Sequence, residues 1–124
     1  MRFLTMVKSR EPGGPPPASL MEAIGKLGEQ ATRSGELVMT GGLLPSALGA
    51  RIRLSGGELA VIDGPFTEAK EIIGGFAIYE VESKEKAVEA SLRFMKLHQE
   101  HWPGWEGETE IRPMYGPADF PGKK

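Results

Sequence analysis

The residues of this chain that are best suited to chemistry gather around one turn in the middle of the sequence. Asp63 precedes Gly64 and Pro65, a turn signature in which the carboxylate can accept hydrogen bonds from nearby backbone N–H groups. The alternative is that Asp63 acts as an acid, a base or a ligand-binding carboxylate, because loops held by a rigid sheet often carry sites. Proton transfer would require a pKa brought toward neutrality by burial or by a neighbouring carboxylate. Asp63 is therefore the candidate catalytic residue.

Charged residues on both sides of this turn could bind a ligand. Arg51 and Arg53 share one face of a predicted strand, where two guanidinium groups could hold a carboxylate or a phosphate. The alternative for both arginines is an ion pair with acidic residues of the same chain or of a partner. Glu68 and Lys70 either belong to a solvated turn or line the mouth of a cleft. The candidate ligand-binding set drawn from these segments is Arg51, Arg53, Asp63, Phe66, Glu68 and Lys70.

Histidine, tryptophan and cysteine define the other chemistry open to the chain. His98 and His101 lie three residues apart near a predicted helix end, but no third ligand completes a metal signature, so no metal site is expected. Trp102 and Trp105 suit structural packing or burial in a dimer, and the alternative is a stacking platform for a ligand. The absence of cysteine excludes disulfides and a thiolate nucleophile. No dinucleotide fingerprint or phosphate-binding loop is present, so no cofactor is expected.

Length and charge limit the class of protein. The 124 residues suit one domain over 1–124, with a core of about 1–115 and an irregular tail at 116–124. The net charge is −2 and no cluster of basic residues occurs, so a nucleic-acid partner is not expected. The apolar stretch at the N-terminus is too short for a signal peptide or a membrane span. We therefore expect a cytoplasmic protein without a membrane partner.

The spacing of apolar residues predicts strands, helices and one hairpin. A first helix is predicted over 18–34, with Ser19 as N-cap and Gly35 just past its end. A second helix is predicted to open at Ser83 and to close at Pro103. A hairpin is expected because two alternating segments, 51–54 and 58–62, flank Ser55-Gly56-Gly57. The remaining strands are predicted over 2–9, 36–44, 76–81 and 108–115.

This order of elements predicts a ferredoxin-like α+β fold. Two βαβ units with a hairpin inserted between them give a four-stranded antiparallel sheet with both helices on one face. The other face of such a sheet would be bare, and soluble monomers rarely expose a large apolar surface. The economical solution is a homodimer in which two sheets pack face to face.

A nine-residue block, DGPFTEAKE at 63–71, resembles the signature of the YCII-related (DGPF) family. The resemblance continues in GGF at 74–76 and EV at 80–81, and outward in ARIR at 50–53 and EIRP at 110–113. It implies a dimeric α+β barrel with a cleft near the DGPF loop. Most proteins of this type have no assigned activity, and some resemble proteins encoded beside extracytoplasmic-function sigma factors, which implies a regulatory or stress role.

A separate branch of the resembled family carries a catalytic His–Asp pair, with the histidine in the first helix. At least one enzyme of that branch eliminates chloride from a chlorinated hydroxyquinol. Residues 18–34 of this chain contain no histidine, so that chemistry is not carried over.

Three functions stay open from the sequence. The chain could be a small dimeric ligand-binding or regulatory protein without turnover, which the incomplete catalytic set favours. It could be a cofactorless enzyme, similar to a lyase or an isomerase, in which Asp63 transfers a proton while Arg51, Arg53 and Lys70 orient negative charge. It could also be an interaction module whose tryptophan-rich segment docks a partner protein.

Overall fold

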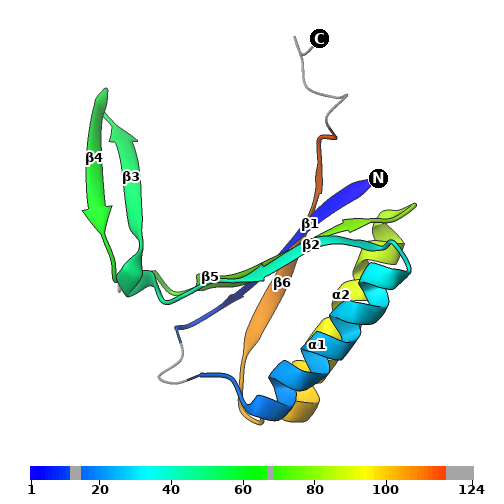
Figure 1. Cartoon of the computed structure of the whole chain (residues 1–124). Helices are drawn as coiled ribbons and strands as arrows, with labels where there is room; N and C mark the ends of the chain where they lie inside the picture. Colours follow the sequence, from blue (N-terminus) through cyan, green and yellow to red (C-terminus); the bar gives the residue numbers. More distant parts are fainter. Residues whose placement is uncertain (12–14, 67–68, 117–124) are drawn as a thin grey trace.

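A computed structural model describes residues 1–11, 15–66 and 69–116 of the chain. The structure contains one four-stranded sheet with two α-helices, and a two-stranded hairpin stands apart from this sheet (Figure 1). The elements in chain order are β1 (Arg2–Ser9), α1 (Ala18–Arg33), β2 (Leu37–Gly42), the short 3₁₀ helix η1 (Ser46–Leu48), β3 (Ala50–Ser55), β4 (Glu58–Asp63), β5 (Ile72–Glu80), α2 (Lys84–His101) and β6 (Gly107–Met114).

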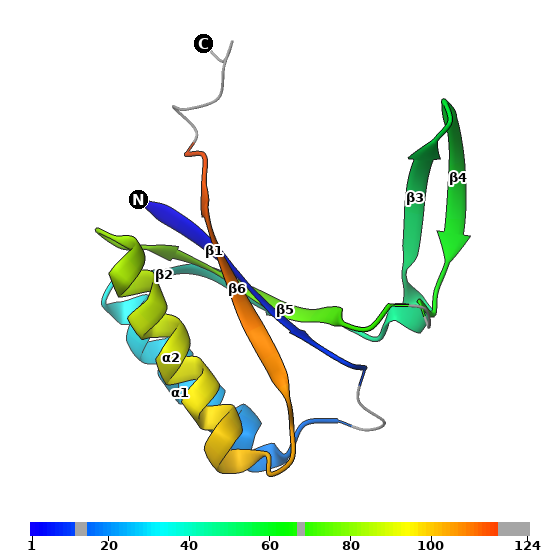
Figure 2. The same cartoon turned by 180° about the vertical axis from the view of Figure 1, so that it is seen from behind.

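The main sheet is antiparallel throughout and has the strand order β2-β5-β1-β6. Both helices cover the same face of this sheet, as the views from front and back show (Figures 1 and 2). Two helices on a four-stranded antiparallel sheet confirm the predicted α+β class and the predicted placement of the helices. The hairpin predicted between the two halves of the chain is also present, as β3 and β4.

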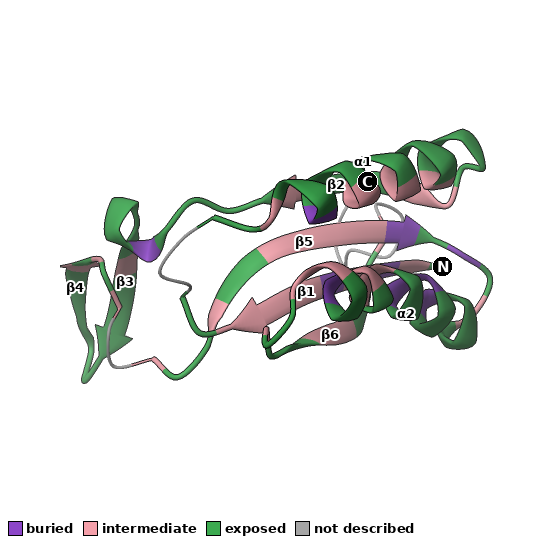
Figure 3. Cartoon of the chain, turned by 90° about the horizontal axis from the view of Figure 1, so that it is seen from below, coloured by how far each residue is buried: buried purple, intermediate pink, exposed green. Residues whose placement is uncertain are grey.

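The core lies between the helices and the covered face of the sheet (Figure 3). Phe3 of β1 and Tyr79 of β5 are register partners, and both are buried there with Ala87 and Ala90 of α2. Successive strand residues point to opposite faces, so Leu4 and Met6 lie on the uncovered face. That face carries half-buried apolar side chains at the centre of the sheet, namely Leu4, Met6, Phe76 and Ile78.

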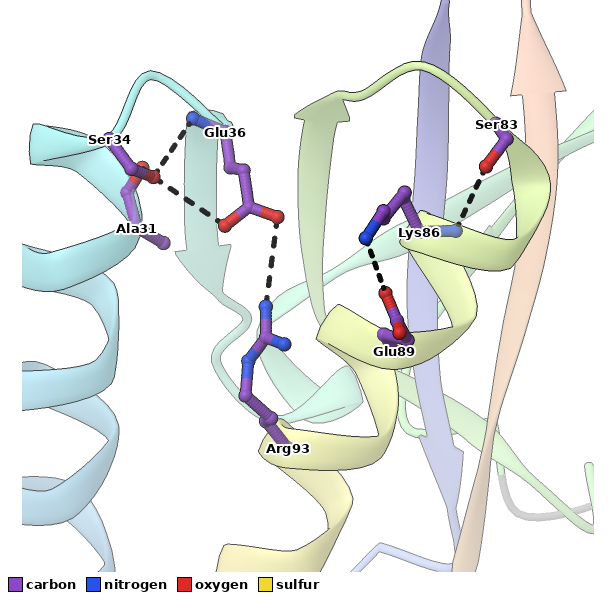
Figure 4. A network of polar contacts seen from close by, with 7 residues as sticks. All are labelled: Ala31, Ser34, Glu36, Ser83, Lys86, Glu89 and Arg93. Carbon is purple, nitrogen blue, oxygen red and sulfur yellow. Dashed lines mark hydrogen bonds and ion pairs between the residues drawn. The ribbon is translucent and has the colours of Figure 1, made fainter.

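Local backbone features hold the ends of the helices, and one ion pair joins α2 to the segment after α1. Ser83 caps α2 by accepting a hydrogen bond from the Lys86 backbone N–H at 3.3 Å, as the sequence predicted. Gly35 has a φ of 84°, a left-handed conformation that explains why α1 ends there. Arg93 of α2 reaches Glu36 just before β2 at 3.6 Å, which ties the second helix to the segment after the first (Figure 4).

The predicted N-cap of the first helix is wrong. The helix begins at Ala18, and the carbonyl oxygen of Pro17 accepts from the backbone N–H groups of Leu20 and Met21. Pro17 is the N-cap residue, with a φ of −57° and a ψ of 144°, so its backbone is still extended just before the helix begins. The hydroxyl of Ser19 instead lies 3.2 Å from Nδ1 of His101, at the end of α2.

The strand predicted over 76–81 begins earlier, at Ile72, because Gly74 and Gly75 continue the strand rather than break it. Gly75 pairs with Val7 on one side and with Gly42 on the other. A Cβ atom at Gly75 would lie only 3.1 Å from the carbonyl oxygen of Gly41, so glycine permits the close approach of the two strands.

Candidate functional site

The DGPF turn begins at the last residue of β4, at the base of the hairpin. Asp63 pairs with Ala50 across the hairpin, and its side chain is exposed. Among the residues that the structure describes, none forms a hydrogen bond or an ion pair with the Asp63 carboxylate. The backbone N–H of Gly64 donates to the carbonyl oxygen of Gly49 at 2.9 Å, and the Gly64–Pro65 peptide bond is cis. The turn is therefore held by its backbone, while its carboxylate faces outward.

A buried serine that the sequence did not single out anchors this turn. Ser46, in η1, donates from its backbone N–H and its hydroxyl to the two carboxylate oxygens of Glu11, at 2.6 and 2.5 Å. The Ser46 hydroxyl also accepts from the backbone N–H of Phe66 at 3.2 Å. The hydrogen bond from the Ser46 hydroxyl is the main cause that lowers the pKa of Glu11 below its usual range, and the backbone hydrogen bond adds to it. Glu11, Ser46 and Phe66 together form what we call the turn anchor.

The two arginines predicted to bind a ligand lie in different surroundings. The guanidinium carbon of Arg51 lies 3.9 Å from the centre of the Phe66 ring, so this side chain stacks on the DGPF turn. Arg53 is exposed further out on the hairpin. Glu68 lies outside the described residues. The cation–π contact supports the geometry of the turn and brings Arg51 together with Phe66.

Lys70 lines a separate surface hollow, which faces the loop between α2 and β6. This hollow has a volume of about 720 Å³ and is widely open to solvent. Two tryptophans form its apolar wall. Its charged residues come from the segments just after β1 and just before β5 and from residues 106–108, where the chain enters β6. We call it the tryptophan hollow; its lining is Arg10, Glu11, Lys70, Glu71, Trp102, Pro103, Gly104, Trp105, Glu106, Gly107 and Glu108.

The tryptophan wall is supported by an aromatic stack from the end of α2. The centres of the Trp102 and Trp105 rings are 6.0 Å apart with the planes nearly parallel. The His98 ring lies 4.5 Å from Trp105 and 4.7 Å from Phe94, with its plane tilted to both. Nδ1 of His98 donates to the carbonyl oxygen of Phe94 at 3.1 Å, since a carbonyl can only accept. The wall is therefore positioned by a buried histidine.

Stability is expected to fall as the pH drops below the ordinary histidine value. Burial lowers the pKa of His98 below 6.5, and the hydrogen bond to Phe94 only partly opposes this. The unfolded chain therefore takes up the proton first, and the free energy of unfolding decreases from pH 6.5 downward. Urea unfolding at several pH values measures the effect.

The variant His98→Phe should remove this pH dependence while it keeps a ring beside Trp105. The variant His101→Gln should retain it. A parallel loss of stability below pH 6.5 in His98→Phe and in the unchanged protein would show that His98 does not cause the pH dependence. A further loss is expected only at lower pH, because Glu11, Glu80 and Glu110 have lowered pKa values and destabilise the fold when they are protonated.

Two broader findings limit the chemistry of the described part of the chain. No three side chains among histidine, aspartate and glutamate come together there as a metal site would require. No helix in residues 1–11, 15–66 and 69–116 is both long and apolar enough to cross a membrane.

Comparison with known proteins adds the family. A sequence profile of the YCII-related domain matches residues 1–93, which run from β1 into α2 and include the DGPF turn. The chain belongs to the YCII-related family. A curated relative is the uncharacterized protein R00369 of Rhizobium meliloti (strain 1021), which is 28% identical over 104 residues, covering 82% of this chain and 80% of that protein. The tryptophan wall of this YCII-related protein lies beyond the segment that the profile matches.

Proposed function

We propose that this YCII-related protein works as a homodimer that binds a small polar or aromatic ligand in the tryptophan hollow, which shares Glu11 with the turn anchor. The observation that carries the proposal is the hollow itself. It combines two stacked indole rings with Lys70 and Arg10 in about 720 Å³, a size typical of small-molecule sites. The indoles would stack on a planar group, Lys70 and Arg10 would bind a negative group, and the four glutamates of the lining would favour a positive one.

The homodimer and the ferredoxin-like barrel belong to the same proposal. The strand order β2-β5-β1-β6 and the position of both helices on one face support the ferredoxin-like plan. The uncovered face supports pairing with a second copy, because its apolar side chains have no layer above them in the described structure (Figure 2). A ligand that is sensed rather than converted would suit the regulatory or stress role that the family resemblance implies.

The charged residues of the uncovered face agree with such pairing. Glu110 binds Lys8 at 2.7 Å and Arg112 at 3.2 Å, and Arg2 binds Glu80 at 3.0 Å. Charges that already have an ion-pair partner within one chain cost less to cover than isolated charges, although these three cations outnumber the two carboxylates by one. A second sheet could therefore pack on this face without leaving an unpaired charge from these five residues.

Ligand binding is expected to change tryptophan fluorescence and to raise the unfolding temperature. The chain has only two tryptophans and both line the hollow, so the fluorescence reports on this site. A panel of small aromatic carboxylates and aromatic amines is the probe. A bound member at 100 times its dissociation constant stabilises the folded protein by about 2.7 kcal/mol. For an anionic member, Lys70→Met should weaken binding roughly 10-fold or more, since a charge-assisted hydrogen bond contributes about 1.5–3 kcal/mol.

The matched control is Lys26→Met, which removes an exposed lysine of α1 that is not among the residues lining the hollow. This variant should bind as the unchanged protein does. Equal weakening in both variants, or a panel in which no member alters fluorescence or unfolding temperature, would argue against the site.

A cofactorless enzyme that uses Asp63 is the second candidate. The observation in its favour is that the Asp63 carboxylate is exposed and makes no polar contact with the described residues, so it is available to a ligand. The panel experiment with Asp63→Asn separates the two functions. Binding that persists while conversion of the ligand disappears supports the enzyme, whereas an unchanged ligand in both proteins supports binding alone.

A further inference from the structure

The β3–β4 hairpin carries an apolar face that none of the described residues covers. Ile52 pairs with Val61, and Leu54 pairs with Leu59, so the four side chains lie on one face in two adjacent rows. Their exposed fractions are 73, 71, 69 and 72% in that order. The strict alternation of apolar and polar residues along β3 is the pattern of a strand with one buried face.

This hairpin cannot bury that face by itself. A two-stranded hairpin is at best marginally stable in water without a layer to pack on. Its two strands pair with each other and form a separate sheet from the main one. Yet its base is fixed. The backbone N–H of Gly64 donates a hydrogen bond to the carbonyl oxygen of Gly49, and the turn anchor holds the segment that follows β4. We call the β3–β4 hairpin the arm. Its base is fixed, and its apolar face is exposed.

The position of the arm points to one occupant. The hairpin rises from the end of the main sheet on the side opposite to the helices, which is the side of the uncovered face (Figures 1 and 2). A copy of the chain that packs on the uncovered face would therefore lie next to the arm. Because a two-fold interface is reciprocal, the arm of the second copy would reach the first in the same way.

The surface available agrees with this assignment. Burying an aliphatic side chain removes roughly 60–120 Å² of apolar surface from water, so four that are about 70% exposed offer roughly 250 Å². That is about a third of the ~800 Å² that each partner contributes to a standard interface. The central sheet residues Leu4, Met6, Phe76 and Ile78 lie on the adjoining face and would supply a further part.

We infer that the apolar face of the β3–β4 hairpin docks on a second copy of this chain, so that in the dimer each hairpin packs against the other subunit. The inference rests on the homodimer of the proposed function and deepens it, because it names the residues that hold the dimer together. It does not depend on the ligand.

The test compares two double variants of the full chain by sedimentation at a series of dilutions. Ile52→Thr with Val61→Thr removes one apolar row, and threonine keeps the tendency to form strands. Ser55→Thr with Glu58→Thr is the control, since these two residues are also register partners but lie on the opposite face. The first variant should raise the dissociation constant of the dimer at least 10-fold, and the control should change it less than 3-fold.

Each outcome bears on the inference. Equal dissociation constants in a protein that is dimeric would overturn the docking of the arm and leave the homodimer standing. An unchanged protein that is monomeric at all concentrations would overturn both. If the first variant fails to fold, a mixture of differently isotope-labelled unchanged chains decides, because methyl contacts from Ile52 or Leu54 to the other chain should appear in filtered NMR spectra. Their absence would refute the docking.

Discussion

Replacing Leu20 by alanine is expected to lower the free energy of unfolding by about 2–5 kcal/mol. Leu20 lies in the first turn of α1 and has no exposed surface. The shorter alanine side chain would therefore leave a buried cavity at this position. A small protein is stable by only roughly 5–15 kcal/mol. The variant should therefore unfold at a much lower urea concentration, measured by circular dichroism.

The control for this prediction is the same substitution at a helical position on the surface. Leu92 of α2 is 60% exposed, and Leu92→Ala should change the free energy of unfolding by less than about 0.5 kcal/mol. Similar losses in the two variants would mean that the packing of α1 described here is wrong.

Replacing Gly64 by alanine is expected to destabilise the DGPF turn more than any other glycine-to-alanine change near it. A Cβ atom at this position would overlap the carbonyl oxygen of Ser46 and lie 3.3 Å from Cα of Ala47. Both are backbone atoms, and Ser46 is held in place by Glu11, so neither neighbour can move aside cheaply. We expect a loss of about 3 kcal/mol, at the upper end of what overpacking costs.

The control is Gly74→Ala in β5. An added Cβ at Gly74 meets nothing within 4 Å, so the stability should change little. The NMR signals of Ser46 and Phe66 should shift in Gly64→Ala and stay in place in Gly74→Ala. A Gly64→Ala protein with unchanged stability and unchanged signals at these two residues would contradict the turn anchor.

The regular elements could be predicted because their signals are local. The alternation along β1 and β5, the Ser83 cap and the paired glycines of the hairpin turn each depend on a few neighbouring residues. Gly56 and Gly57 do adopt the positive φ that such a turn requires, at 59° and 80°.

The turn anchor could not be predicted, because its partners are distant in the chain. Glu11 and Ser46 are 35 residues apart, and Glu11 opens a segment rich in proline and glycine that reads only as a loop. The same limit explains Gly74 and Gly75, which read as a break until the neighbouring strands that approach them are known.

The candidate site was predicted only in part for the same reason. Local pattern identified Lys70 and the two tryptophans separately, but only the folded chain places them around one hollow. It also places Arg51 on Phe66, which neither residue type predicts alone. The roles of Arg51, Arg53, Asp63 and Phe66 in ligand binding stay predictions, because none of these residues lines the hollow.

The central claim is that one chain is half of an assembly, with an uncovered sheet face and an uncovered arm that a second copy hides. Sedimentation equilibrium of the full chain from about 1 to 100 µM tests it most directly. We expect a species of twice the 13.4 kDa chain mass that dissociates only on dilution. A single species of one chain mass over the whole range would contradict it.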